Sequence, residues 1–224
     1  MLRTRHILAC TVLVVSLSGC RQSQDVVSSA SLAQTVEYNA PALPAANQRA
    51  ATKAEKIVAR ARQEAERAVT YDAEYRDLSY PNGDPPETKG ACTDVVIRAY
   101  RAAGYDLQRL IHEDMRRNFS RYPQSYGLKR PDHNIDHRRV PNQMTFLRRH
   151  GRALPIGTTG AAVQSWMPGD IVYWKLDSGL DHCGIISDRR GATGLPLVIH
   201  NLSVAREEDC LAAWKITGHF RYPR

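Results

Sequence analysis

The chain has 224 residues, of which 42% are hydrophobic and 24% are charged. This composition is that of a globular protein long enough to bury one sizeable core, and it excludes a largely disordered chain. The formal net charge is +8, and adjacent arginines contribute to it, but no basic stripe is interleaved with stacking aromatic residues. A nucleic-acid partner is therefore not expected, whereas an anionic partner of another kind is.

The N-terminal segment has the pattern of a signal peptide. Two arginines, Arg3 and Arg5, precede an apolar run over residues 7–17 that is too short to span a bilayer. The residues that end this run, Leu17-Ser18-Gly19-Cys20, resemble a bacterial lipobox, in which the cysteine is lipidated and becomes the new N-terminus. The resemblance implies a signal peptide over residues 1–19, export, and a membrane anchor made of acyl chains on Cys20.

The residues after Cys20 indicate where the anchor places the protein. Arg21 follows directly, and the lack of an Asp there favours the outer membrane, facing the periplasm, under the enterobacterial sorting rule. A plain secretory signal cleaved nearby is the alternative. Residues 20–45 are rich in Ser, Gln, Ala and Pro, which predicts a flexible tether. Losing Arg3 and Arg5 lowers the formal charge by two, to +6, so anionic cell-wall material is the expected partner.

The folded domain is predicted over residues 46–224. Alanine and aliphatic residues recur at helical spacing from residue 46 to residue 68, which predicts an amphipathic helix with a shallow apolar face. The large residues of a coiled-coil seam are missing, so we expect this helix to pack against its own domain and the protein to be a monomer.

Two further helices follow a turn-forming stretch at residues 78–86, which is rich in Pro, Asn and Gly. The first is predicted from Cys92 to about Ala103, and the second from the N-cap Asp106 to about residue 119. A thiol in the first turn of a helix lies at the positive end of the helix dipole, which favours the thiolate. Cys92 is therefore the candidate nucleophile.

The C-terminal half is predicted to be mainly strands. A long polar loop over residues 120–140 and a short helix over residues 142–150 come first. Strand-like runs then follow at residues 171–174, 180–187, 196–201 and 214–221. Helices followed by a mainly antiparallel sheet predict an α+β domain.

These strands offer partners for the thiol. His182 is the candidate base, and His200, or Asn201 beside it, is the candidate group that orients the base. Side chains alternate between the two faces of a strand, so the choice between His200 and Asn201 depends on a register that the pattern does not determine.

Cysteine usage is compatible with a reactive thiol. Of five cysteines, Cys10 leaves with the signal peptide and Cys20 carries lipid, so Cys92, Cys183 and Cys210 remain. An odd number in an oxidising compartment leaves at least one free thiol, with or without a Cys183–Cys210 bridge. The alternative to that bridge is two small buried hydrophobic residues.

Taken together, these features resemble the NlpC-type cysteine peptidases: a helix-borne cysteine, a strand start Pro168-Gly169-Asp170-Ile171-Val172, and a strand His182-Cys183-Gly184-Ile185-Ile186. More closely, motifs within residues 71–222 look like those of the family called domain of unknown function 1287: Gly90-Ala91-Cys92-Thr93-Asp94-Val95-Val96, His112-Glu113-Asp114-Met115, Asn134-Ile135-Asp136-His137-Arg138-Arg139-Val140-Pro141 and Gly218-His219-Phe220-Arg221-Tyr222.

The resemblance implies a circularly permuted papain-like fold and cleavage of an amide bond in peptidoglycan peptides. It assigns Cys92 as the nucleophile, His182 as the base and His200 as the orienting residue, with Asn201 as the alternative. It also implies an upstream tyrosine in the site, for which Tyr71 and Tyr80 are the candidates. No cofactor is implied.

Several polar residues remain as candidates for binding. Asp94, in the first turn of the Cys92 helix, is expected to act structurally, although it could also bind substrate. The pairs Asp132-His133 and Asp136-His137 recur at a spacing of four, but Pro131 argues against a continuous helix, so a metal site is not expected. His133, Asp136 and His137, with Arg138 and Arg139, are instead candidates to clamp the carboxylates of a stem peptide.

Two other functions fit the same pattern. One is a catalytically silent lipoprotein that binds the cell wall, and the other is an acyltransferase or transamidase that passes the acyl group to an amine or hydroxyl.

The lipobox is directly testable. Replacing Cys20 with Ser removes the site of lipidation, so the variant should leave the membrane fraction and appear in the soluble one. Fractionation followed by immunoblotting measures this. A Cys20→Ser variant that stays in the membrane fraction to the same extent as the unaltered protein would contradict the predicted anchor.

Overall fold

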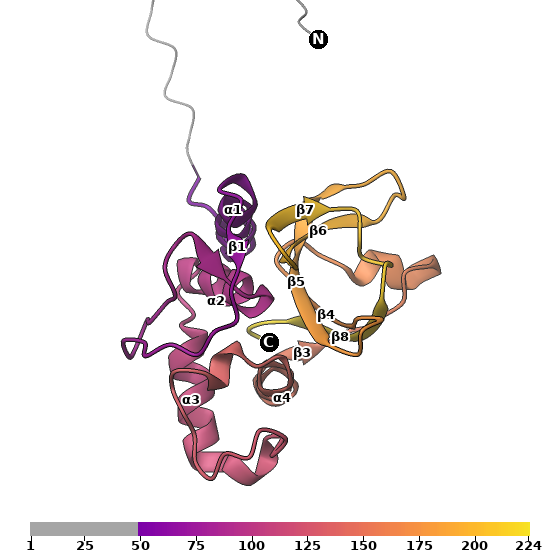
Figure 1. Ribbon diagram of the computed structural model, residues 1–224. Coiled ribbons are helices and arrows are strands. Elements are labelled where there is room, and N and C mark those ends of the chain that lie inside the picture. Colours follow the sequence, from indigo (N-terminus) through magenta and orange to yellow (C-terminus); the bar gives the residue numbers. More distant parts are fainter. Residues whose placement is uncertain (1–48) are drawn as a thin grey trace, which may run out of the picture. The chain divides into compact units, whose positions relative to one another are not determined.

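The computed structural model describes residues 49–224, and within them helices come first and strands follow (Figure 1). The predicted signal peptide over residues 1–19, the lipidated Cys20 and the tether over residues 20–45 lie outside the described residues. The α-helices are α1 (Lys53–Glu66), α2 (Cys92–Ala102), α3 (Leu107–Asn118) and α4 (Val140–His150), with short 3-10 turns η1 (Phe119–Arg121), η2 (Asp136–Arg138) and η3 (Gly160–Ser165). The strands are β1 (Thr70–Tyr71), β2 (Lys89–Gly90), β3 (Arg152–Ala153), β4 (Ile171–Lys175), β5 (Asp181–Arg190), β6 (Pro196–Asn201), β7 (Ala205–Glu208) and β8 (Lys215–Arg221).

Local capping determines where the first helices start. The Thr52 side chain accepts a hydrogen bond from the Glu55 backbone N–H at 3.2 Å, and the Glu55 carboxylate accepts one from the Thr52 N–H at 2.8 Å. This reciprocal pair starts α1 at Lys53, seven residues after the predicted start at residue 46. Asp106 caps α3 as expected, because its side chain accepts from the Gln108 N–H at 3.1 Å.

The main sheet has six strands in the order β3-β8-β4-β5-β6-β7, and all neighbouring pairs are antiparallel. The helices lie on one side of the molecule and the strands on the other, and α2 packs against β5 and β6 (Figure 1). The structure therefore confirms the predicted α+β fold, with N-terminal helices packed on an antiparallel sheet. The short strands β3 and β7 were not predicted. In the part of the chain that the structure describes, no helix is both long and apolar enough to cross a bilayer.

Alternation along the strands divides the core in two. On β4, Ile171 and Tyr173 face the helices, whereas Val172 and Trp174 face a second cluster on the other side of the sheet. All four side chains are fully buried. Because both faces of β4 are covered, its sequence reads as a continuous apolar run.

A buried arginine ties the helices to the segment that leads into the thiol. Arg98 of α2 donates to the carboxylate of Glu64 on α1 at 2.7 Å, and both side chains are almost completely buried. The same guanidinium donates to the backbone carbonyls of three residues in the preceding segment, Pro85, Pro86 and Lys89. Arg98 therefore holds residues 85–89 against the first turns of α2.

Removing this arginine should be costly. Arg98→Ala leaves the buried Glu64 carboxylate with Arg60 as its remaining partner and removes the donor to three carbonyls, so we expect a loss of about 3 kcal/mol in the free energy of unfolding. Urea denaturation measures it. The matched control is Arg109→Ala on α3, whose ion pair with Glu113 is exposed and should contribute under about 1 kcal/mol. Equal destabilisation by both substitutions would contradict the structural role of Arg98.

Candidate active site

Cys92 is the first residue of α2 and lies directly after β2. The backbone N–H of Ala91, the residue before the helix, donates to the Asp94 carboxylate at 2.6 Å, which secures the first turn. The Cys92 side chain is 5% exposed, so it lies at the floor of the site rather than on an open surface. This position places the thiol at the positive end of the helix dipole, as the sequence predicts.

Two neighbours on β5 meet this thiol. Hydrogen bonding by the Cys183 thiol and by the His182 ring lowers the pKa of Cys92 to about 5, against the opposing effect of burial. Burial raises the pKa of Cys183 well above its ordinary value, so Cys183 keeps its proton and acts as the donor. Cys92 is therefore a thiolate at neutral pH, held between a thiol donor and an imidazole.

His200 lies on the far side of His182. The His182 Nε2 and His200 Nδ1 atoms are 2.9 Å apart, which leaves the Nδ1 atom of His182 for the thiol. Burial, together with the charges of His182 and Arg206, lowers the pKa of His200 to about 4, so its ring is neutral at pH 7 and can accept a hydrogen bond. Trp174 stacks on the His182 ring with centroids 5.6 Å apart.

The register of β6 separates His200 from Asn201. Their side chains point to opposite faces of the sheet, and only His200 is on the side of His182. The Asn201 amide donates instead to the backbone carbonyls of Val69, at 3.0 Å, and Gly90, at 2.9 Å. Asn201 thus anchors the backbone just before Cys92 and leaves the orienting position to His200.

The predicted carboxylate clamp is mostly interior. The side chains of Asp136, His137 and Arg138 are buried, and Arg138 forms a 2.9 Å ion pair with Asp94 in which both side chains are 1% exposed. Arg138 also donates to the backbone carbonyls of Asp72 and Glu74. These contacts correct the expected substrate role of the three residues, because the Arg138 guanidinium is already saturated and Asp136 and His137 are out of reach of a ligand. Asp94 has the structural role that was favoured for it.

The remaining candidates stay at the surface. Tyr71 is 43% exposed and lies across from Gly90 in the register of β1 and β2, and burial, followed by the charge of Cys92, raises its pKa. Tyr80 lies elsewhere, with its ring centroid 5.3 Å from that of His133. The Arg139 guanidinium lies over the ring of Tyr126, 4.1 Å from the centroid. Of the two candidate tyrosines, Tyr71 is the one that pairs with the strand just before Cys92.

Sequence reasoning missed Cys183 and the aromatic wall. Cys183 was considered as a disulfide partner of Cys210 or as a small buried hydrophobic residue, and both cysteines are free and buried, as is Cys92. Trp174 and Trp214 flank the two histidines, with Trp214 5.9 Å from His182 and 6.0 Å from His200 between ring centroids. Cys183 follows His182 on β5, so its side chain points to the opposite face of the strand, toward the helices. This alternation is the signal that could have placed Cys183 beside Cys92.

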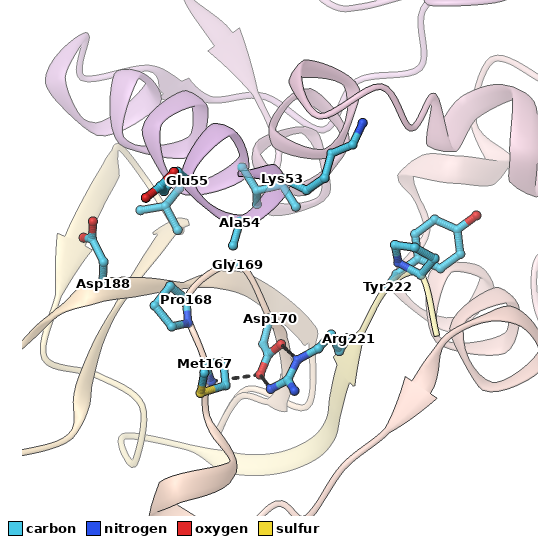
Figure 2. Close-up of a pocket in the computed structure, with 13 residues that line it drawn as sticks. Lys53, Ala54, Glu55, Met167, Pro168, Gly169, Asp170, Asp188, Arg221 and Tyr222 are labelled. Atoms are coloured by element: carbon cyan, nitrogen blue, oxygen red, sulfur yellow. Dashed lines mark hydrogen bonds and ion pairs between the residues drawn. The ribbon is translucent and has the colours of Figure 1, made fainter. Parts of the chain in front are cut away.

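Neither a metal-binding cluster in the described residues nor the cavity near the start of α1 is part of the thiol site. Among residues 49–224, no cluster of three or more His, Cys, Asp or Glu side chains could hold a metal ion. A cavity of about 550 Å³ lies between the start of α1, the turn before β4 and the C-terminal residues, and its lining lacks Cys92, His182 and His200. Figure 2 shows that Asp170 in this cavity is turned toward Arg221, with a 2.6 Å hydrogen bond between them. The thiol site is therefore separate from this cavity.

The fold and site define a class of protein: an α+β domain in which an acidic cysteine at a helix start meets a pair of histidines from neighbouring strands. The chain belongs to the family described as Domain of unknown function (DUF1287), whose model matches residues 58–222. A relative, the uncharacterized protein YijF of Escherichia coli (strain K12), is 51% identical over 163 residues, which cover 72% of this chain and 78% of YijF. Among solved structures, NlpC1 from Trichomonas vaginalis matches with a TM-score of 0.42 and 15% identity over 77% of this chain and 45% of NlpC1. This chain thus spans less than half of the length of NlpC1.

The ionisation of Cys92 gives a direct test. Because the thiolate is the reactive form, alkylation of Cys92 by iodoacetamide should slow as the pH falls through the pKa of about 5. Cys183→Ala removes the thiol donor and should raise the midpoint by about one pH unit. Peptide mass spectrometry assigns the alkylated residue.

Cys210 provides the control, because burial raises its pKa to about 12 and it is not among the groups that shift the pKa of Cys92. Cys210→Ala should leave the Cys92 profile unchanged. A midpoint for Cys92 in the range of an ordinary thiol would contradict the described electrostatics.

Proposed function

We propose that the protein is a cell-envelope lipoprotein with a papain-like fold that hydrolyses an amide bond in peptidoglycan peptides through a cysteine thiolate and an acyl-enzyme. The observation that carries this proposal is the relay from Cys92 to His182 to His200, with a thiol of pKa about 5 and a 2.9 Å contact between the two rings. A buried, inert cysteine has a raised pKa instead, as Cys183 and Cys210 do in this chain.

The proposed reaction has two stages. The Cys92 thiolate attacks the amide carbonyl carbon, and the C–N bond breaks as His182 delivers its proton to the leaving nitrogen. Water then attacks the thioester, His182 takes a proton from that water, and the thiolate leaves as the carboxylate product forms. His200 accepts a hydrogen bond from His182 Nε2 throughout and keeps the other ring nitrogen aimed at the thiol.

Charge that develops on the carbonyl oxygen also needs donors. The backbone N–H of Cys92 lies in the first turn of α2, where N–H groups have no partner within the helix. The Tyr71 hydroxyl is the proposed second donor, because Tyr71 lies across from Gly90, two residues before Cys92. Both are assigned to the oxyanion in the proposed mechanism.

Charge and the N-terminal pattern support the substrate class. The formal charge of +8, which falls to +6 once Arg3 and Arg5 leave with the signal peptide, suits an anionic polymer, and the lipobox resemblance implies exposure to the cell-wall compartment. His133, Tyr80 and Arg139 keep exposed surface and remain as proposed contacts with the stem peptide.

Peptidoglycan digestion tests the proposal. The purified full-length protein should release muropeptide fragments with new amine and carboxyl ends, detected by mass spectrometry. Cys92→Ala should lower the initial rate by roughly a thousandfold or more because the nucleophile is lost. His200→Ala should lower it by roughly tenfold or more because His182 loses its orienting partner.

Cys210→Ala is the matched control and should retain full activity, since Cys210 is a buried thiol away from the site. Identical fragments from the unaltered protein and from Cys92→Ala would reject the enzyme in favour of a silent wall-binding protein. Products in which the acyl group is joined to an amine or hydroxyl acceptor, rather than released as a carboxylate, would indicate an acyltransferase.

A further inference from the structure

The outer nitrogen of His200 is buried without a partner. The His200 side chain is 4% exposed, and its Nε2 atom has no hydrogen-bond partner among the described residues. The other ring nitrogen, Nδ1, is the one in contact with His182. Buried polar atoms are usually paired, so the surroundings of Nε2 require an explanation.

The tautomer of His200 follows from the reaction. To take a proton from water in the second stage, His182 needs a lone pair on Nδ1, so its own proton is then on Nε2. That N–H donates to His200 Nδ1, which must then be the unprotonated nitrogen of a neutral ring. The single proton of His200 is therefore on Nε2, and it needs an acceptor.

The groups around Nε2 narrow the choice of acceptor. Trp174 and Trp214 present ring faces and edges, and the Trp174 indole N–H already donates to the Leu211 carbonyl. From β7, Arg206 lies directly across from His200 in the strand register, but it is a cation and cannot accept. Glu208, two residues further along β7, has its Oε2 atom 3.8 Å from His200 Nε2.

We infer that Glu208 is a positioning residue, which accepts the Nε2–H of His200 and so extends the relay to Cys92, His182, His200 and Glu208. This inference deepens the proposed function and rests on it for its catalytic meaning. The Glu208 side chain is 41% exposed and lies 3.7 Å from Arg206, so a small rotation about its side-chain bonds closes the 3.8 Å gap.

The carboxylate has two effects on the thiol. It selects the His200 tautomer that accepts from His182, and its negative charge stabilises the protonated His182 ring that faces the thiolate. It also offsets Arg206, whose charge lowers the pKa of His200. Loss of the carboxylate should therefore raise the pKa of Cys92 and slow its alkylation below that pKa.

Nitrogen NMR of the histidine rings reads the tautomer without any substrate. In the unaltered full-length protein His200 should be the Nε2–H tautomer. Glu208→Ala should give a mixture with the Nδ1–H form, whereas Glu208→Gln, which keeps an acceptor oxygen, should retain the original tautomer. Arg206→Ala is the matched control, because it breaks the Arg206 ion pair but keeps the carboxylate, and it should not change the tautomer.

Alkylation of Cys92 supplies the second measurement. Glu208→Ala should raise the midpoint of the Cys92 pH profile by about half a unit. Below the midpoint, this shift makes alkylation roughly threefold slower. Arg206→Ala should not raise the midpoint. An unchanged His200 tautomer in Glu208→Ala, or equal shifts in Glu208→Ala and Arg206→Ala, would overturn the inference. Failure of the proposed function would show separately, as absence of cleavage by an unaltered protein whose His200 still responds to Glu208→Ala.

Discussion

The contact between the first turn of α2 and β5 is the constraint on which the site depends. It places the Cys92 thiol against His182 and Cys183, which belong to a strand about ninety residues away in the chain. Three independent anchors hold the backbone at this point: Arg98 binds the preceding carbonyls, Asn201 binds the carbonyl of Gly90, and the Asp94–Arg138 pair secures the first turn. Each anchor buries polar groups, which cost free energy unless they are fully paired. The donors of all three anchors are paired, which indicates that the position of α2 relative to β5 is tightly specified.

The three cysteines of the described domain show how neighbours, rather than burial, determine ionisation. All three are buried, and desolvation raises the pKa of each. For Cys210 nothing opposes that effect and the pKa rises to about 12. For Cys92 the donors on β5 outweigh it, and the pKa falls to about 5. The helix start alone does not account for this difference, because the first cause is the Cys183 thiol, which belongs to another element. The protonation of one thiol thus stabilises the ionisation of the other.

Much of the fold was predictable from local pattern. The bounds of β6 were predicted without error and those of α2 within one residue, because turn residues delimit both. The edge strand β7 was missed because Ala205-Arg206-Glu207-Glu208 has no apolar alternation to mark it. The candidate nucleophile and base also follow from the chain order, but the choice of His200 over Asn201 required the register of β6.

The clamp assigned to Arg138 was misplaced for a different reason. Arginine is seldom fully buried, so its sequence neighbourhood favours a surface role, and only a distant partner, Asp94, reverses that expectation.

The polar segment around η2 supports the site from inside the domain. Residues of that composition are expected to lie in solvent, yet Asn134, Asp136 and Arg138 are buried. Asn134 accepts from the Leu78 N–H at 2.8 Å, and Arg138 binds the carbonyls of Asp72 and Glu74, so the segment fastens the chain on either side of Tyr75. That fastened chain begins at Tyr71, which pairs with Gly90 just before Cys92. The loop therefore acts on the site through the backbone it holds, and not through contacts of its buried charges with a ligand.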